Sequence, residues 1–183
     1  GERVTFNKGV DTFFDRMDAL VQNDSQSSLQ CKHYIVSSSI QDVIEGSVVA
    51  DKVSRIYASQ FHYSERGFAF PKMVVNDALK TQCLYRINKG KEEWSEDVNG
   101  YMSEEERPVP FSNMIYIGDG VTDIPALSVV RKNGGYGIAV YQEKNKKNRN
   151  ILIELIDGDR IDFVAKSDYS SESYLSRAVK TIL

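Results

Sequence analysis

The chain has 183 residues, of which 41% are hydrophobic and 27% are charged, and its formal net charge is −3. These values are typical of a soluble globular domain of ordinary size. Because no basic stripe dominates, nucleic acid is excluded as an expected partner. No apolar run is long enough to span a bilayer, so no membrane partner is expected and the predicted location is cytoplasmic.

The cysteines and the short basic run carry little functional signal. Cys31 and Cys83 have no CxxC or histidine-rich neighbourhood, which argues against a zinc site and fits two reduced thiols in the cytosol. The basic run at residues 144–149 lies in a polar stretch, and we interpret it as a solvated loop.

Hydrophobic periodicity predicts helices and strands that alternate along the first half of the chain. The expected elements are, in order, a helix over residues 10–22, a polar linker over 23–30, a strand over 33–36, a helix from residue 40 that is broken or ended near Gly46, and a strand over 55–59. A strand pair over residues 61–75 follows, with its turn at Glu65, Arg66 and Gly67.

The second half continues this alternation. The expected elements are a helix over residues 77–88, a polar excursion over 89–107, a buried strand over 113–117, a helix over 123–135 with Pro125 in its first turn, strands over 136–141 and 162–166, and an amphipathic helix over 170–183. Strands that alternate with helices predict an α/β fold with a mostly parallel sheet. Ligands of such sheets bind at the carboxyl ends of the strands.

Two carboxylates follow the buried strand at one such end, in the stretch YIGDGVTDIPAL over residues 116–127. Asp119 leaves the strand and Asp123 returns from the first helical turn, so both can face one point. Glycines on either side of Asp119 permit a tight turn. Carboxylate oxygens suit Mg²⁺. The alternative is that Asp119 only forms a turn and Asp123 only caps the helix.

Two further polar residues lie near the expected ligand side. Ser37 follows a strand and precedes a helix, so its hydroxyl and the free N–H groups of that helix could hold a phosphate oxygen. The alternative is that Ser38 or Ser39 is only the N-cap. Lys80, near the start of a later helix, could neutralise a bound phosphate, and its alternative is an ordinary surface charge.

A serine after a strand (Ser37), a lysine opening a later helix (Lys80) and the GDxxxD stretch (Asp119 and Asp123) occur in this order. Together they resemble the haloacid dehalogenase superfamily of hydrolases, and most closely its uncharacterised bacterial phosphatase-like members. GDGVTDIPAL is the most specific part. The resemblance implies a three-layer, Rossmann-like α/β core over residues 31–183, with residues 1–30 as the returning helix and linker of a helical cap.

The resemblance also implies a function: a magnesium-dependent phosphatase that hydrolyses a small phosphorylated metabolite through an aspartyl-phosphate. Asp119 would ligate Mg²⁺, and Asp123 would ligate it or orient its water. Ser37 and Ser38 would bind the phosphoryl group together with Lys80, which would also steady the nucleophile. Lys80, Asp119 and Asp123 are therefore the implied catalytic residues.

The nucleophile motif of that superfamily, DxDx[T/V], is not found upstream of Ser37, where the aspartates lie in the predicted helix or the linker. We therefore expect the first core strand, its nucleophile and most of the cap to come from an N-terminal segment outside this sequence or from a complementary fragment. The Asp157-Gly158-Asp159 stretch is no permuted motif, because the following residues do not fit and Gly158 is expected to end a helix.

Two other functions remain open. The phosphorylation domain of an ion-pumping P-type ATPase carries a very similar GDGxxDxPAL stretch, but this sequence has no transmembrane segment and no DKTGT. A non-catalytic member of the superfamily would bind phosphate and magnesium without turnover.

Overall fold

In the computed structural model, the structure describes residues 5–22, 29–142 and 148–183, which divide into two compact units. The first unit comprises Gly1–Val75 with Ser167–Leu183, and the second comprises Asn76–Lys166. The predicted cap boundary at residue 30 lies within the first unit, and the assignment of residues 1–30 to a cap remains a prediction. The predicted α/β class with mostly parallel strand pairing is confirmed.

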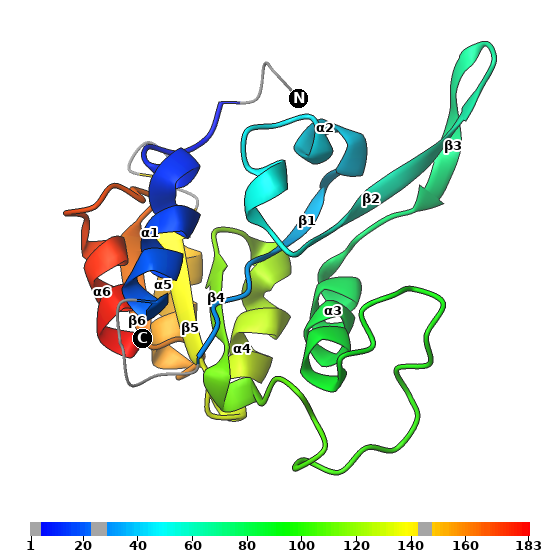
Figure 1. The fold of residues 1–183 in the computed structure, drawn as a ribbon. Coiled ribbons are helices and arrows are strands. Elements are labelled where there is room, and N and C mark those ends of the chain that lie inside the picture. The colour runs from blue at the N-terminus through cyan, green and yellow to red at the C-terminus, as the bar shows by residue number, and fades with distance from the viewer. Residues whose placement is uncertain (1–4, 23–28, 143–147) are drawn as a thin grey trace. The chain divides into compact units, whose positions relative to one another are not determined.

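The first unit is built on a three-stranded sheet of order β1-β2-β3, in which β1 and β2 are parallel and β2 and β3 form an antiparallel hairpin (Figure 1). Its elements are α1 (Val10–Gln22), β1 (Tyr34–Ile40), α2 (Gln41–Glu45), the 3-10 helix η1 (Ala50–Lys52), β2 (Arg55–Ser64), β3 (Gly67–Met73) and α6 (Tyr174–Ile182). The far end of the hairpin extends beyond β1 and α2 (Figure 1).

Two predicted boundaries in this unit were wrong. Strand β1 continues through the serines to Ile40, with a shift in its register against β2 after Val36. The buried hydroxyl of Ser59 on β2 donates to the carbonyl oxygen of Ser38 at 3.1 Å, which helps hold the serines extended. The two strands expected at 55–59 and 61–64 are one strand, β2. The helix expected from residue 40 was predicted to break or end near Gly46, and this is confirmed: α2 ends at Glu45, and the 3-10 helix η1 follows.

Helices α1 and α6 confirm the helices predicted at residues 10–22 and 170–183, although α6 begins later than expected, at Tyr174. Phe13 and Met17, one turn apart, are the buried residues of α1, and α1 packs on α6. The rings of Phe13 and Tyr169 meet edge to face with centroids 5.2 Å apart. The N-cap of α6 is Ser173, whose hydroxyl accepts a hydrogen bond from the backbone N–H of Ser176 at 3.1 Å.

The second unit is built on an all-parallel sheet of order β4-β5-β6. Its elements are α3 (Asp77–Lys89), the 3-10 helix η2 (Phe111–Asn113), β4 (Ile115–Gly118), the 3-10 helix η3 (Val121–Asp123), α4 (Ile124–Lys132), β5 (Tyr136–Tyr141), α5 (Asn148–Asp157) and β6 (Phe163–Lys166). Helix α4 connects β4 to β5 and packs on both strands, and α3 lies beside α4 (Figure 1). The helix-strand alternation predicted for this half of the chain is therefore confirmed.

Helix α3 has well-defined ends. The side chain of Asn76 accepts a hydrogen bond from the backbone N–H of Leu79 at 2.9 Å, and Gly90 ends the helix in a left-handed conformation with φ of 63°. The predicted polar excursion follows, and it contains neither helix nor strand between Gly90 and the start of η2. The buried Arg86 guanidinium holds this loop by donating to four of its carbonyl oxygens, those of Lys91, Glu93, Trp94 and Glu96.

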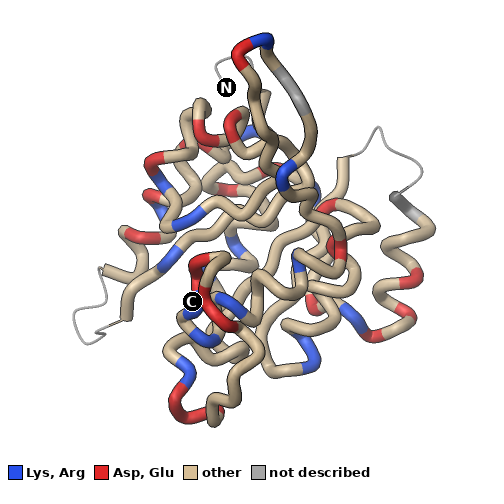
Figure 2. Tube along the Cα trace, turned by 90° about the vertical axis from the view of Figure 1, so that its right-hand side faces the viewer, with Lys and Arg blue, Asp and Glu red and all other residues tan. Residues whose placement is uncertain are grey.

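Acidic and basic residues are interspersed along the described parts of the trace, as expected for a chain without a basic stripe (Figure 2). Among the described residues, no helix combines the length and the apolar character that a bilayer span requires. Both cysteines are free thiols. Most of the basic run at 144–149 lies outside the described residues.

Candidate functional site

The site predicted around Asp119 lies at the carboxyl end of strand β4. The strand ends at Gly118, the chain turns through Asp119 and Gly120, and η3 leads directly into α4. Pro125 stands in the first turn of α4, as predicted. The loop from Gly118 to Asp123 therefore lies at the edge of the parallel sheet where ligands of α/β proteins bind.

Gly118 allows the close approach of Asp123. A Cβ atom built on Gly118 would lie 2.6 Å from Cβ and 2.8 Å from Cγ of Asp123, well inside van der Waals contact. Any side chain at this position would push the Asp123 carboxylate away from the strand end. The first glycine of the GDG stretch is therefore needed for packing within the loop.

Lys80 and Asp123 form a buried ion pair. Lys80 Nζ lies 2.7 Å from Asp123 Oδ1, and both side chains are 7% exposed. Lys80 also donates to Thr122 Oγ1 at 3.0 Å. The alternative for Lys80, an ordinary surface charge, is wrong, because its ammonium is buried and contacts Thr122 and Asp123. Of its three N–H donors, two have partners among the described residues.

The carboxylate of Asp123 has three hydrogen-bond partners within this unit, of which Lys80 is the first. Its Oδ1 also accepts from Tyr116 Oη at 2.6 Å, and its Oδ2 accepts from the backbone N–H of Gly120 at 3.1 Å. Burial and the Asp123 charge raise the pKa of Tyr116, so its hydroxyl stays protonated and donates. Asp123 is the N-cap residue of α4 but makes no side-chain hydrogen bond to that helix, and its Oδ2 instead caps the start of η3. The alternative that Asp123 only caps a helix is wrong, because it also pairs with Lys80. In this arrangement it holds Lys80 and the loop in position.

Asp119 is the exposed carboxylate of the loop. Within the described part of the second unit, no group of three or more His, Cys, Asp and Glu side chains is arranged to hold a metal ion. Asp119 could supply one oxygen ligand to Mg²⁺, and further ligands would have to come from water, substrate or another segment. The assignment of Mg²⁺ to Asp119 and Asp123 remains a prediction.

The serines predicted to bind phosphate belong to the first unit. Ser37 Oγ accepts a hydrogen bond from the backbone N–H of Ser39 at 3.1 Å. The N-cap of α2 is Ile40, which makes no side-chain cap, so the alternative role of Ser38 or Ser39 as the N-cap is wrong. The helix that follows has only five residues. A location of Ser37 and Ser38 beside Lys80 and Asp119 remains a prediction.

The Asp157-Gly158-Asp159 stretch is a helix end, as the sequence predicted. The backbone N–H of Gly158 donates to the carbonyl of Glu154 at 3.0 Å. Asp159 adopts a left-handed conformation and pairs with Arg131, with Arg131 Nη1 and Asp159 Oδ1 2.7 Å apart. This ion pair lowers the pKa of Asp159. Nothing in this segment resembles a nucleophile at a strand end.

A second cluster of chemically active side chains lies in the first unit, and the sequence analysis missed it. His33 Nε2 lies 2.8 Å from Asp18 Oδ1, and Cys31 Sγ lies within 4.8 Å of both ligand atoms. Burial and the Asp18 charge raise the pKa of Cys31, so the thiol is a poor nucleophile at neutral pH. In the sequence, only the Cys-x-His spacing of Cys31 and His33 points to this cluster. Asp18 lies 13 residues before Cys31, too far for a local motif to include it.

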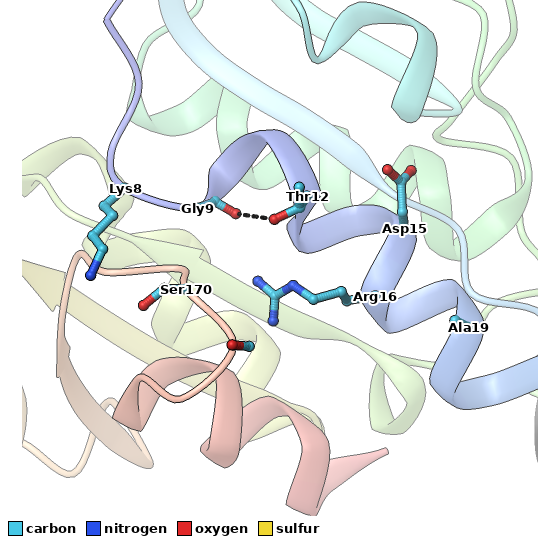
Figure 3. Close-up of a pocket in the computed structure, with 8 residues that line it drawn as sticks. Lys8, Gly9, Thr12, Asp15, Arg16, Ala19 and Ser170 are labelled. Carbon is cyan, nitrogen blue, oxygen red and sulfur yellow. Dashed lines mark hydrogen bonds between the residues drawn. The ribbon is translucent and has the colours of Figure 1, made fainter.

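An open hollow is also present in the first unit, between the start of α1 and the loop before α6 (Figure 3). Its charged groups already have partners in the described structure. Arg16 donates to the carbonyl of Tyr169, Asp15 pairs with Lys52, and Lys8 Nζ lies 3.7 Å from Asp168 Oδ2. These contacts hold the charged side chains that line the hollow.

Comparison with known proteins finds a relative of this chain. The chain is 28% identical over 193 aligned residues to an uncharacterized protein of Borreliella burgdorferi strain B31. The alignment covers 96% of the chain but 65% of that protein, so the chain spans less than two thirds of the relative's length. No family model and no solved structure matches the chain.

Proposed function

We propose that the protein is a magnesium-dependent phosphatase of the haloacid dehalogenase type, with a three-layer core and a small phosphorylated metabolite as its substrate. The observation that carries this proposal is the buried Lys80–Asp123 pair, in which Asp123 belongs to the same strand-end loop as the exposed Asp119. A buried lysine with an N–H to spare, beside an exposed carboxylate, suits a phosphoryl group and a divalent cation held together.

The edge of β4 leaves a place for one more strand, which could carry the nucleophile from another segment. Within the described second unit, β4 pairs with β5 on one side, and no strand pairs with its other side. A further parallel strand on that edge would end about 4.8 Å away, beside the Gly118–Asp123 loop. In the superfamily that this sequence resembles, the nucleophilic aspartate follows such a strand. The longer relative leaves room for one, since over a third of its length lies outside the alignment.

The proposed reaction divides the work among these groups. The carboxylate of the supplied aspartate attacks phosphorus, the bond to the substrate oxygen breaks, and water then hydrolyses the aspartyl-phosphate. Lys80, fixed by Asp123 and Thr122, offsets negative charge on a phosphoryl oxygen. Asp119 would hold Mg²⁺, which supplies further charge stabilisation when bound. Ser37 and Ser38 remain proposed ligands of the phosphoryl group.

Phosphate release by the natural full-length protein tests this proposal. We expect hydrolysis of p-nitrophenyl phosphate, or of at least one member of a panel of sugar, nucleotide and amino-acid phosphates, with Mg²⁺ present. Activity should disappear in EDTA and return when excess Mg²⁺ is added.

The absence of phosphate release from every compound in that panel, with Mg²⁺ present, would contradict a phosphatase. Saturable binding of Mg²⁺ and phosphate without turnover would then favour the non-catalytic alternative. Hydrolysis confined to ATP would favour the phosphorylation domain of a pump.

A further inference from the structure

We propose that Asp18, Cys31 and His33 form a binding site for a borderline or soft divalent metal ion such as Zn²⁺, separate from the proposed magnesium site. Each residue offers one ligand atom, and the three atoms lie within 4.8 Å of one another. Helix α1 carries Asp18, while Cys31 and His33 precede strand β1, so the fold brings together residues from two segments of one unit.

The donor set selects the metal. A thiolate sulfur, an imidazole nitrogen and a carboxylate oxygen are all common zinc ligands, and sulfur is a poor ligand for Mg²⁺ or Ca²⁺. A thiolate and a carboxylate together would neutralise a divalent ion. Three protein ligands leave the fourth tetrahedral position for water or another ligand.

The geometry requires only small side-chain movements. In a tetrahedral zinc site, neighbouring ligand atoms lie about 3.3–3.6 Å apart, given the usual metal–ligand bond lengths. The hydrogen-bonded pair His33 Nε2 and Asp18 Oδ1, now 2.8 Å apart, would open slightly, and Cys31 Sγ would move inward by at most roughly 1.2–1.5 Å. The Phe14 ring packs edge-on against His33 at 5.0 Å, which limits the orientation of the imidazole.

The simpler role for these residues is a His33–Asp18 hydrogen bond that fastens α1 to the start of β1. That role requires no contribution from Cys31. The two interpretations therefore differ at the sulfur atom, and a probe of sulfur coordination separates them.

Titration of the reduced, metal-free 183-residue chain with Co²⁺ provides this probe. We expect one equivalent to produce a near-ultraviolet sulfur-to-cobalt charge-transfer band and intense visible bands of tetrahedral cobalt, and Zn²⁺ to remove both. Cys31→Ala should lose the charge-transfer band. Cys83→Ala is the matched control, because Cys83 is the other cysteine and lies in α3 of the other unit. It should keep the band.

Asp18→Asn and His33→Gln should weaken cobalt binding while Cys31 remains in place, and circular dichroism would verify that each variant is folded. The site is disproved if the wild-type chain gives no charge-transfer band at millimolar Co²⁺. A band that survives in Cys31→Ala would equally overturn it. Because Asp119 and Lys80 take no part in this readout, its failure leaves the proposed phosphatase untouched.

Discussion

Replacing Lys80 by methionine is expected to lower the free energy of unfolding by about 3–5 kcal/mol, because the variant leaves the Asp123 carboxylate buried without its cation. Both side chains of the pair are 7% exposed, so water cannot solvate the remaining charge without local opening. Methionine keeps much of the length and apolar character of the lysine side chain. Urea denaturation followed by circular dichroism measures the loss.

Lys132→Met is the matched control, because Lys132 is exposed on α4 of the same unit. Its effect should stay within about 0.5 kcal/mol. The double variant Lys80→Met/Asp123→Asn removes both buried charges. Its loss of unfolding free energy should therefore be smaller, by about 1–3 kcal/mol, than the sum of the losses in Lys80→Met and Asp123→Asn. If Lys80→Met proved as stable as Lys132→Met, the buried pair would not exist as described.

Asp119→Asn is expected to reduce the kcat of the natural full-length protein in Mg²⁺ by about a hundredfold or more. The substitution keeps the shape of the side chain and removes the charge proposed to hold the metal. Because Asp119 is exposed, the stability of the protein should hardly change. Steady-state phosphate release measures the first effect and thermal unfolding the second.

Asp157→Asn serves as the control for this activity measurement. Asp157 is an exposed aspartate at the end of α5, and it belongs to the stretch considered as a permuted nucleophile motif. This variant should keep wild-type activity. Wild-type kcat in Asp119→Asn would remove the metal assignment, whereas loss of activity in Asp157→Asn would revive the permuted motif.

Much of the second unit could be predicted from the sequence, because its signals are local. Alternating buried strands and helices, Pro125 in a first turn and a glycine after α3 each follow from short-range sequence preferences. The first unit was harder to predict. Small polar residues such as Ser38 have no strong strand preference, and their extended conformation depends on pairing with β2 and on the buried Ser59.

Only part of the candidate site could be predicted in the same way. The residues of the GDxxxD stretch lie close in sequence, so their position at one strand end follows from local pattern. The partners of Asp123 do not follow from it, because Lys80 lies 43 residues away and Tyr116 has no sequence signal beyond its place in the expected strand. The Asp18–Cys31–His33 cluster depends on how α1 packs near β1, which no sequence spacing reveals.

Paramagnetic broadening by Mn²⁺, a hard divalent substitute for Mg²⁺, tests most directly whether the Gly118–Asp123 loop is a metal site. The measurement is a ¹H–¹⁵N NMR titration of the 183-residue chain and of Asp119→Asn. We predict that substoichiometric Mn²⁺ broadens the amide signals of Gly118, Asp119 and Gly120 first in the wild-type chain, and that Asp119→Asn abolishes this effect. Broadening that is absent from the loop, or unchanged in Asp119→Asn, would contradict the account.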